Sequence, residues 1–513
     1  MEDHNRLQLH LMPPQGWMND PNGLCQFQGQ YHVFYQYSPE DAMGAAKLWG
    51  HYVSDDLLHW RSMKPALYPD IDEDRSGVFS GSAYMEHDRM YLYYTGHVAW
   101  PKKYEGQYDD VYQGFDENTI LVTSEDGEHF SSKQVLLTNR DYPKGYSQHV
   151  RDPKVWREQD CYYMIQGARR RSNVQMEDRS IQSVDPAEDQ GTVLIFKSDN
   201  LVDWTCTQEQ TTPRFFGYMW ECPDYFVLNG QKILSVSPQG LESEPYRFQN
   251  RYESGYFLLD ASVVEIPSRQ PAGQRLGDIS HRLDIDATRF REWDMGFDFY
   301  APQTFLDDKG RRVLIGWVGN PDAAYDNQPT IDQGWQHALS IPRELIWKNN
   351  QVYQLPVEEM QRLRHDSIQS TDGVYEIASG KAVELRVDHI QSDIQFVLTD
   401  DMHIDMRKEA IDGTQPPEDT LLESDWVQLR YTDQVLELSL SSQAGRGRSV
   451  RRARLEKLTQ LQIYIDTSML EIYVNGGELV MTTRYYLGDA TRRLTLEGVE
   501  NSKLWKLDGL MIQ

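Results

Sequence analysis

The sequence lacks any long hydrophobic run and any basic leader. Nowhere do eighteen apolar residues follow one another, and the opening stretch, MEDHNRLQLHLMPPQGW, contains no basic region followed by an apolar one. We therefore expect neither a membrane-spanning helix nor a secretion signal. These absences predict a soluble, cytoplasmic protein without a membrane partner.

Basic residues are scarce relative to acidic ones. The chain has 51 Lys and Arg residues against 79 Asp and Glu residues, which gives a formal net charge of −28. Such a charge repels phosphate backbones and anionic membrane surfaces. We therefore expect no nucleic-acid partner.

Cysteine is also rare. Cys25, Cys161, Cys206 and Cys222 lie far apart and form no CxxC pair. This spacing is typical of reduced, buried thiols rather than of a disulfide framework or a zinc site. No metal centre is expected from them.

What the chain does contain is a repeated hairpin unit. Five segments share a polar or acidic start, a strand-like run, a tight turn and a second strand-like run. The units begin at Asp20, Ser80, Asp152, Glu221 and Asp298, so successive starts are 60, 72, 69 and 77 residues apart. A second pattern, SDDLLHW at 54–60, recurs as SEDGEHF at 124–130 and SDNLVDW at 198–204. Sheet units that recur in this way are typical of propeller blades.

We predict an all-β protein in which a five-bladed β-propeller is followed by a C-terminal β-sandwich. At 513 residues the chain exceeds what one hydrophobic core supports. The propeller is expected over residues 1–345, a linker with a short helix over 346–365, and the sandwich over 366–513, where segments such as AVELRV and VLELSL alternate in polarity. The alternative is one β-sandwich, or a series of hairpins whose similarity is accidental. Two independent recurring patterns favour the propeller.

Three of the five unit starts are carboxylates that a proline follows directly or after one residue. They are Asp20 in NDPNG, Asp152 in RDP and Glu221 in ECP. Equivalent positions of propeller blades lie at the same radius, so we expect the three acids to meet at one central mouth. Cleavage of a glycosidic bond needs one neutral carboxyl to protonate the leaving oxygen and one carboxylate to attack. A single such acid could merely begin a strand, but three in register favour catalysis.

The flanking residues predict different charge states for the three acids. Arg151 precedes Asp152 and should hold it ionised, as a stabiliser of positive charge. Glu221 follows the apolar pair Met-Trp, which should raise its pKa toward that of a general acid. Asp20 lies in a donor-rich turn that should keep it ionised, as a nucleophile requires.

Several longer motifs closely resemble those of the invertase and sucrose-6-phosphate hydrolase family of β-fructofuranosidases, glycoside hydrolase family 32. They include WMNDPNG (17–23), WGHYVSDDLLHW (49–60), FSGSA (79–83), RDP (151–153), ECP (221–223) and DTSMLEIYVNGGE (466–478). The resemblance spans the chain. It implies a glycosidase that cleaves terminal β-fructofuranosyl bonds in sucrose, sucrose 6-phosphate or short fructo-oligosaccharides, with retention and without a cofactor or metal. A small fructoside is the partner it implies, and a monomer and a homodimer remain open.

The resemblance also implies roles for individual residues. Asp20 becomes the nucleophile, Glu221 the acid/base and Asp152 the stabiliser of the transition state. Substrate contacts are expected from Asn19, Gln36, Trp49, Phe79, Ser80, Arg151, Asp298 and Trp317. For Gln36, Trp49 and Trp317 the alternative is a purely structural place in a strand or core.

Two segments are longer than the family pattern predicts, 99–119 and 167–193. The first is rich in tyrosine and acids, and we expect it to shape the leaving-group side. The second contains Arg169, Arg170 and Arg171, which are candidates to bind an anionic sugar by paired donors. A solvated charged loop is the interpretation that we favour for it.

Other functions stay open at this stage. A fructosyltransferase or a fructan hydrolase would use the same three acids but a different acceptor or substrate. From a different class, a noncatalytic carbohydrate-binding propeller, or a chain whose acids hold Ca²⁺, would bind without turnover.

Overall fold

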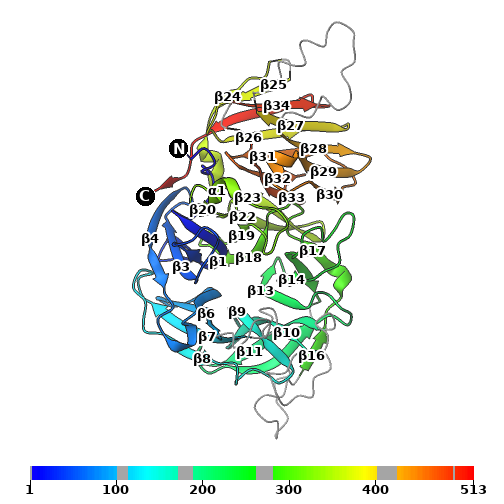
Figure 1. The fold of residues 1–513 in the computed structure, drawn as a ribbon. Coiled ribbons are helices and arrows are strands. Elements are labelled where there is room, and N and C mark those ends of the chain that lie inside the picture. The colour runs from blue at the N-terminus through cyan, green and yellow to red at the C-terminus, as the bar shows by residue number, and fades with distance from the viewer. Residues whose placement is uncertain are drawn as a thin grey trace.

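The computed structural model describes residues 3–100, 114–171, 189–260, 281–371, 373–400, 425–488 and 491–513. It confirms the predicted fold, because five sheets form a β-propeller and two further sheets form a β-sandwich at one end of it (Figure 1). Both chain ends lie on the same side of the molecule, near the junction of the two regions. None of the helices in these ranges is long and apolar enough to cross a membrane.

Each propeller sheet begins with the hairpin that the repeat predicts and adds further strands, most of them antiparallel. The first sheet has β1 (Gly16–Phe27), β2 (Gln30–Ser38), β3 (Leu48–Ser54) and β4 (His59–Leu67). The second has β5 (Gly77–Glu86), β6 (Arg89–Ala99), β7 (Phe115–Ser124) and β8 (Gln134–Leu137). The third has β9 (Tyr146–Glu158), β10 (Cys161–Arg170), β11 (Gln190–Ser198), β12 (Thr205–Thr211) and β16 (His281–Asp284).

The fourth and fifth sheets complete the ring. The fourth has β13 (Met219–Leu228), β14 (Gln231–Gln239), β15 (Gly255–Leu259) and β17 (Phe290–Glu292). The fifth has β18 (Tyr300–Leu306), β19 (Arg312–Val318), β21 (Ala338–Leu339), β22 (Arg343–Lys348) and β23 (Gln351–Pro356). The first strands contact one another in order, and β18 contacts β1, so the ring is closed.

Two short elements fasten the first sheet to distant parts of the chain. β20 (Trp335–Gln336) pairs in parallel with β1, and β36 (Met511–Ile512), at the end of the chain, pairs in parallel with β4. The first blade is thereby held by residues from the fifth blade and from beyond the sandwich.

The sandwich is built from two six-stranded antiparallel sheets. One has β24 (Arg364–Ile368), β26 (Val383–Asp388), β31 (Gln460–Ile465), β32 (Met469–Val474), β33 (Leu479–Arg484) and β35 (Ser502–Leu507). The other has β25 (Val374–Ile377), β27 (Ile394–Asp400), β28 (Trp426–Thr432), β29 (Val435–Leu440), β30 (Val450–Arg454) and β34 (Arg492–Glu497).

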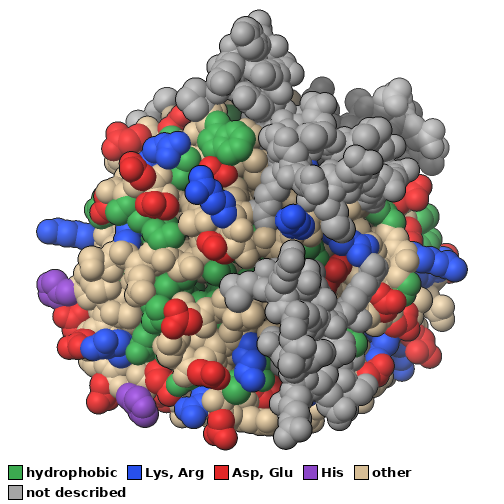
Figure 2. Space-filling view, turned by 90° about the horizontal axis from the view of Figure 1, so that it is seen from below, with side chains coloured by type: hydrophobic (Ala, Val, Ile, Leu, Met, Phe, Trp, Pro, Cys, Tyr) green, Lys and Arg blue, Asp and Glu red, His purple; other side chains and the backbone are tan. Residues whose placement is uncertain are grey.

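Burial follows the packing of the two regions. In β27 alternate residues are buried, among them Ile394, Phe396 and Leu398, because one face of a sandwich sheet meets the core and the other meets solvent. In β6 the run from Leu92 to Tyr94 is buried without alternation, because both faces of a propeller sheet pack against neighbouring blades. On the face seen in Figure 2, acidic and basic side chains are interspersed over the described surface.

A short 3₁₀ helix, η5 (Glu358–Leu363), follows the fifth sheet, where a connecting helix was expected. The fifth sheet itself continues through β23 to Pro356. The exact limits of the two domains stay a prediction.

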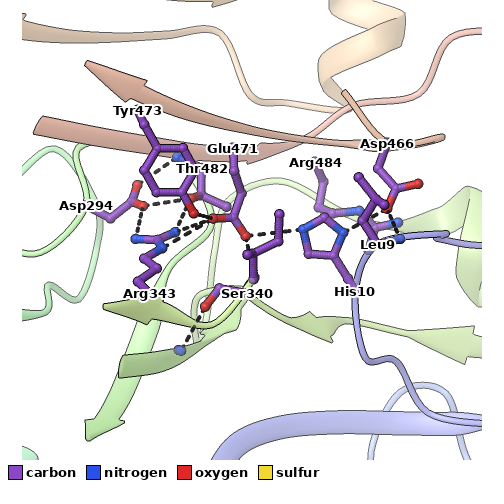
Figure 3. Close-up of polar contacts among 12 residues, drawn as sticks. Leu9, His10, Asp294, Ser340, Arg343, Asp466, Glu471, Tyr473, Thr482 and Arg484 are labelled. Carbon is purple, nitrogen blue, oxygen red and sulfur yellow. Dashed lines mark hydrogen bonds and ion pairs between the residues drawn. The ribbon is translucent and has the colours of Figure 1, made fainter. Parts of the chain in front are cut away.

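The propeller and the sandwich meet across a buried network of charged side chains (Figure 3). His10 Nδ1 lies 2.8 Å from Asp466 Oδ2, and its Nε2 lies 3.2 Å from Glu471 Oε1. On the other side of Glu471, Arg343 Nη2 lies 2.9 Å from Oε2, and Arg343 Nη1 reaches Asp294 Oδ2 at 3.2 Å. Since all five side chains are almost fully buried, the junction is held by charge pairing as well as by apolar contact.

Candidate active site

The first strand of every blade is interrupted by a β-bulge at the same place. The ladder shifts between Met18 and Pro21, Phe79 and Gly81, Arg151 and Lys154, Glu221 and Asp224, and Tyr300 and Gln303. Bulges of this kind re-aim side chains and are common beside active sites. Three of the bulges hold a non-glycine residue in the left-handed region, at Asp152 (φ 62°), Cys222 (φ 46°) and Ala301 (φ 48°).

The prolines define the true register of the repeat. Asp20, Asp152, Cys222 and Ala301 each precede a proline, and Ser80 takes the same place in the second blade. The residues one position earlier are Asn19, Phe79, Arg151, Glu221 and Tyr300, and all five line one central cavity. The predicted convergence of the blades is therefore present, but Glu221 occupies the position before the one that Asp20 and Asp152 occupy.

This cavity has a volume of about 710 Å³ and brings the three predicted acids together. Asp20, Asp152 and Glu221 all lie on its wall. The backbone N–H of Cys222 donates to Asp152 Oδ2 at 2.8 Å, and Cys222 Sγ lies 3.7 Å from Asp20 Oδ2. Cys222 thus lies between two of the acids and directly after the third.

Asp20 is held by a short chain of donors. Ser80 Oγ donates to its Oδ2 at 2.6 Å, and Gln36 Nε2 donates in turn to Ser80 Oγ at 2.5 Å. Asn19 Nδ2 donates to Oδ1 at 3.1 Å. Burial nevertheless raises the pKa of Asp20 above its ordinary value, although the hydrogen bonds from Ser80 and Asn19 oppose the rise.

Glu221 is contacted by donors from three blades. Arg151 Nη2 lies 2.5 Å from its Oε1, while Tyr300 Oη and Gln239 Nε2 donate to Oε2 at 2.6 and 2.7 Å. Arg151 also reaches Glu117, with Nη1 3.1 Å from both carboxylate oxygens. The carboxyl of Glu221 is therefore oriented at both of its oxygens.

Asp152 differs from the expectation drawn from its neighbour in sequence. The hydrogen bonds of the Arg151 guanidinium go to Glu221, Glu117 and His149 and not to Asp152. Burial raises the pKa of Asp152 to about 8, and the nearby Glu221 and Asp20 add to the rise against the opposing charge of Arg151. The expectation that Arg151 holds the pKa of Asp152 low is wrong, because burial outweighs the charge of Arg151 and its hydrogen bonds go to other partners.

The donors expected around Asp20 are present, although burial still raises its pKa, and the expected surroundings of Glu221 are corrected. Glu221 was expected in an apolar setting, yet it receives an ion pair and two further hydrogen bonds. The apolar Trp220, its neighbour in sequence, is buried in the core with residues such as Phe257 instead of facing the carboxyl.

Six of the eight expected substrate-contact residues lie on the cavity wall. They are Asn19, Gln36, Phe79, Ser80, Arg151 and Trp317. The phenyl ring of Phe79 stacks on His97 with ring centroids 4.1 Å apart. Trp317 lies beside Trp17, with ring centroids 6.1 Å apart.

Trp49 and Asp298 do not line the cavity. Trp49 is fully buried behind the wall, where its Nε1 donates to the carbonyl of Phe79 at 3.0 Å. Asp298 is fully buried on the sandwich side and forms a two-pronged ion pair with Arg448, with both N–O distances 2.8 Å. Their expected places in the site are corrected: one is a core aromatic and the other belongs to the junction.

The sequence reasoning missed several residues of the cavity wall. These are Trp17, Lys47, Glu117, His149, Tyr218, Gln239, Tyr252 and Tyr300. Tyr300 could have been found, because the proline register places it with Glu221 and Arg151. For Glu117 and Lys47, which lie outside the first strands, the repeat carries no signal.

The two long segments are described only in part. Residues 115–119 of the first begin β7 and include Glu117, which lines the cavity. Residues 101–113 and 172–188 lie outside the described residues. In the second segment Arg169 is buried against Asp189 at 2.8 Å and Arg170 pairs with Glu209 at 3.3 Å, so both guanidinium groups already have carboxylate partners.

The alternative of a cation site finds no support in the geometry. Over the described ranges, no group of three or more His, Cys, Asp and Glu side chains is arranged to hold a metal ion. The cavity acids are instead held by the donors described above.

Comparison with known proteins connects this cavity to a family. The model described as "Glycosyl hydrolases family 32 N-terminal domain" matches residues 10–356, and the model for the family's C-terminal domain matches residues 433–506. A sucrose-6-phosphate hydrolase of Bacillus subtilis is 33% identical over 98% of this chain and 93% of its own length. A sucrose-6-phosphate hydrolase of Escherichia coli is 34% identical over 97% of this chain and 94% of its own.

Solved structures show the same architecture. A Bombyx mori GH32 beta-fructofuranosidase mutant in complex with sucrose superposes with a TM-score of 0.76 at 26% identity, covering 100% of this chain and 96% of that one. A sucrose-6-phosphate hydrolase from Lactobacillus gasseri superposes with a TM-score of 0.77 at 25% identity, covering 99% and 94%.

Proposed function

The chain belongs to glycosyl hydrolases family 32 as a β-fructofuranosidase, and we propose that it hydrolyses sucrose 6-phosphate or sucrose with Asp20 as nucleophile and Glu221 as acid/base. The observation that carries the proposal is the meeting of Asp20, Asp152 and Glu221 on the wall of one cavity. Relatives of nearly full length that are named sucrose-6-phosphate hydrolases support the substrate class.

In the first step, a carboxylate oxygen of Asp20 attacks the anomeric carbon of the fructosyl group. The bond from that carbon to the bridging oxygen breaks, and Glu221 donates its proton to the leaving oxygen. Ser80 and Asn19 support this role for Asp20, because their hydrogen bonds orient its two oxygens. In the second step, water loses a proton to Glu221 and attacks the fructosyl ester, which restores Asp20.

Glu221 must exchange its partners during this cycle. Arg151 is paired with Glu221 through Nε and Nη2, whereas the first step requires Glu221 to give a proton to the leaving oxygen. We infer that the hydroxyl groups of the bound fructosyl group take over donors of Arg151. Tyr300 and Gln239 remain as groups that orient the carboxyl.

We propose that Asp152 binds the fructose hydroxyls and stabilises the positive charge of the transition state. Burial raises its pKa to about 8, and the hydroxyls of a bound fructosyl group would offer its carboxyl new donors. Asn19, Gln36, Phe79, Ser80, Arg151 and Trp317 complete the proposed fructose site. The cytoplasmic location, and the choice between a monomer and a homodimer, stay predictions.

Initial rates on sucrose, sucrose 6-phosphate, kestose and inulin test the proposal. We expect the two disaccharides to be hydrolysed fastest and the first-formed fructose, followed by NMR, to be the β anomer. Release of the α anomer would contradict the double displacement. Glucose release that exceeds fructose release would indicate a transferase, and a preference for inulin would indicate a fructan hydrolase.

A further inference from the structure

The wall of the cavity is strongly acidic for a site that is to receive a phosphorylated sugar. Five carboxylates line it, from Asp20, Glu117, Asp152, Glu221 and Asp322. The whole chain, these five residues included, has a formal net charge of −28. A phosphate monoester carries nearly two negative charges at neutral pH, so it requires a cation close to its binding place.

Only two Lys or Arg side chains appear on the described wall, and one of them is already paired. Arg151 forms ion pairs with Glu117 at 3.1 Å and Glu221 at 2.5 Å, and its Nη1 also lies 2.7 Å from His149 Nδ1. The other is Lys47, which lies between β2 and β3 of the first blade.

Lys47 forms no ion pair with any described carboxylate. Its Nζ donates to Ser38 Oγ at 3.0 Å and lies 4.7 Å from the centre of the Trp17 ring. An ammonium group has three donors, so two are left for a ligand. Burial lowers the pKa of Lys47 to about 8, although the attraction of Asp20 and Asp41 opposes this shift. A lowered pKa is expected for a buried ammonium group that lacks a close counter-ion.

The side chain is held in place by its surroundings. The backbone N–H of Val78, in the neighbouring blade, donates to the carbonyl of Lys47 at 2.8 Å. Gly44 (φ +89°) leaves room for the ammonium group, since a Cβ there would lie 3.0 Å from Nζ and 3.3 Å from Trp17. The lysine is thus positioned before any ligand arrives, which lowers the ordering cost of binding.

We propose that Lys47 is a specificity-determining residue that binds the phosphate group of a phosphorylated fructoside and so favours it over the neutral sugar. The inference rests on the proposed function, because it places the phosphate in the same cavity as the three acids. The shared chemistry is a phosphate monoester, and it could stand on the glucosyl or on the fructosyl half of the substrate.

The test is the ratio of kcat/KM for a phosphorylated substrate to kcat/KM for sucrose. Wild type, Lys47→Met and Lys47→Arg are compared on sucrose 6-phosphate, on sucrose 6′-phosphate and on sucrose. We expect Lys47→Met to lower the ratio by about 10- to 100-fold for one of the two phosphates, as loss of a hydrogen bond to a charged group predicts. The phosphate that responds identifies the half of the substrate that carries the group, and Lys47→Arg should retain part of the ratio.

Lys64→Met is the matched control. Lys64 is exposed on β4 of the same sheet and does not line the cavity. Lys64→Met removes one positive charge, as Lys47→Met does. Its ratio should equal that of wild type. Equal loss on sucrose and on both phosphates in Lys47→Met would overturn the inference, because a lysine that only supports Trp17 or the nucleophile affects all substrates alike.

A binding measurement separates this inference from the proposed function. Calorimetry compares glucose 6-phosphate with glucose and fructose 6-phosphate with fructose, in wild type and in Lys47→Met. If wild type hydrolyses no fructoside, the proposed function fails, while a phosphate-dependent affinity that Lys47→Met removes still supports the role of Lys47. If wild type hydrolyses sucrose but gains neither rate nor affinity from either phosphate, the role of Lys47 fails alone.

Discussion

Two clusters of buried charge lie in this molecule, and they are balanced in opposite ways. At the junction of propeller and sandwich, His10 and Arg343 alternate with Asp466 and Glu471. At the cavity, Arg151 pairs with Glu221 and Glu117, while no guanidinium among the described residues pairs with Asp20 or Asp152.

The direction of the pKa shifts records the difference. At the junction, pairing with Arg343 and His10 outweighs burial and lowers the pKa of Glu471 to about 2. In the cavity, burial outweighs the local donors and raises the pKa of Asp20 and of Asp152. Asp294, at the edge of the junction network, behaves like the cavity acids, because burial raises its pKa despite Arg343.

The comparison teaches how a buried charge network divides between stability and chemistry. A network in which each charge has a partner resists a change of protonation, which suits a structural joint. A network short of positive charge exchanges protons near neutral pH and accepts new partners, which suits catalysis. Four predictions test this division, in order of decreasing expected effect.

Removal of the proposed nucleophile or acid should have the largest effect. We expect Asp20→Ala and Glu221→Ala each to lower kcat on sucrose by about 10⁴-fold or more, as loss of a catalytic group that acts within a unit does. Thermal unfolding should show that both variants remain folded. Normal turnover in either variant would refute the assignment of that residue. The cavity cluster could then no longer be contrasted with the junction as the catalytic one.

Breaking one pair at the junction should mainly affect stability. Arg343→Met leaves Glu471 without its guanidinium partner, and we expect it to lower the free energy of unfolding by about 3–5 kcal/mol, measured by urea unfolding. The control is Arg362→Met, whose partner Asp56 lies 2.9 Å away in an exposed pair. That change should cost at most about 1 kcal/mol. Similar losses in the two variants would mean that the junction network is no more important than a surface pair.

The pH dependence of stability should also separate the clusters. Pairing with Asp466 and Glu471 raises the pKa of His10 from 6.5 to about 8 despite burial. A raised histidine pKa stabilises the fold below the unfolded value of 6.5, and this contribution is lost as the pH rises through 8. We expect a loss of about 2 kcal/mol between pH 6 and 9, and His10→Asn should flatten it. An unchanged slope in His10→Asn would assign the pH dependence to other groups.

The repeat made the architecture predictable from sequence. Each blade brings its own tight turn between two strand-like runs, so five hairpins are visible without any knowledge of how they pack. Asp20 and Asp152 were predictable for the same reason, because each stands directly before a proline at the start of a hairpin. These features are local, and local features can be read from one chain.

What failed depended on distant partners. The repeat predicted that Asp298 begins the fifth hairpin and faces the cavity. Its carboxylate instead forms an ion pair with Arg448, which lies 150 residues later in the sandwich. Arg151 was assigned to the carboxylate next to it in sequence, whereas the bulge turns its guanidinium to Glu221 and Glu117. Charge balance is set by such long-range pairs, so the protonation states could not be predicted, although two of the three acids directly precede a proline.

The last prediction has the smallest expected effect but tests the comparison most directly. Removal of one buried carboxylate should change the free energy of unfolding in opposite directions in the two clusters. The pKa of Asp152 is raised from 3.8 to about 8, so its ionisation in the folded protein opposes folding increasingly as the pH rises between these values. Asp152→Asn removes that cost, and we expect it to raise the free energy of unfolding at pH 8 by about 1–2 kcal/mol while kcat falls steeply. At pH 4 the gain should vanish.

Asp466→Asn is the matched change at the junction, where hydrogen bonds from His10 and from two backbone N–H groups lower the pKa of the carboxyl despite burial. It should destabilise the protein at pH 8, in contrast to Asp152→Asn. Since both substitutions remove one buried carboxylate with little change of shape, opposite signs can arise only from the partners that each carboxylate has. If both substitutions change the free energy of unfolding in the same direction, burial alone sets the energy of these charges. The acids of the cavity would then destabilise the fold no more than those at the junction.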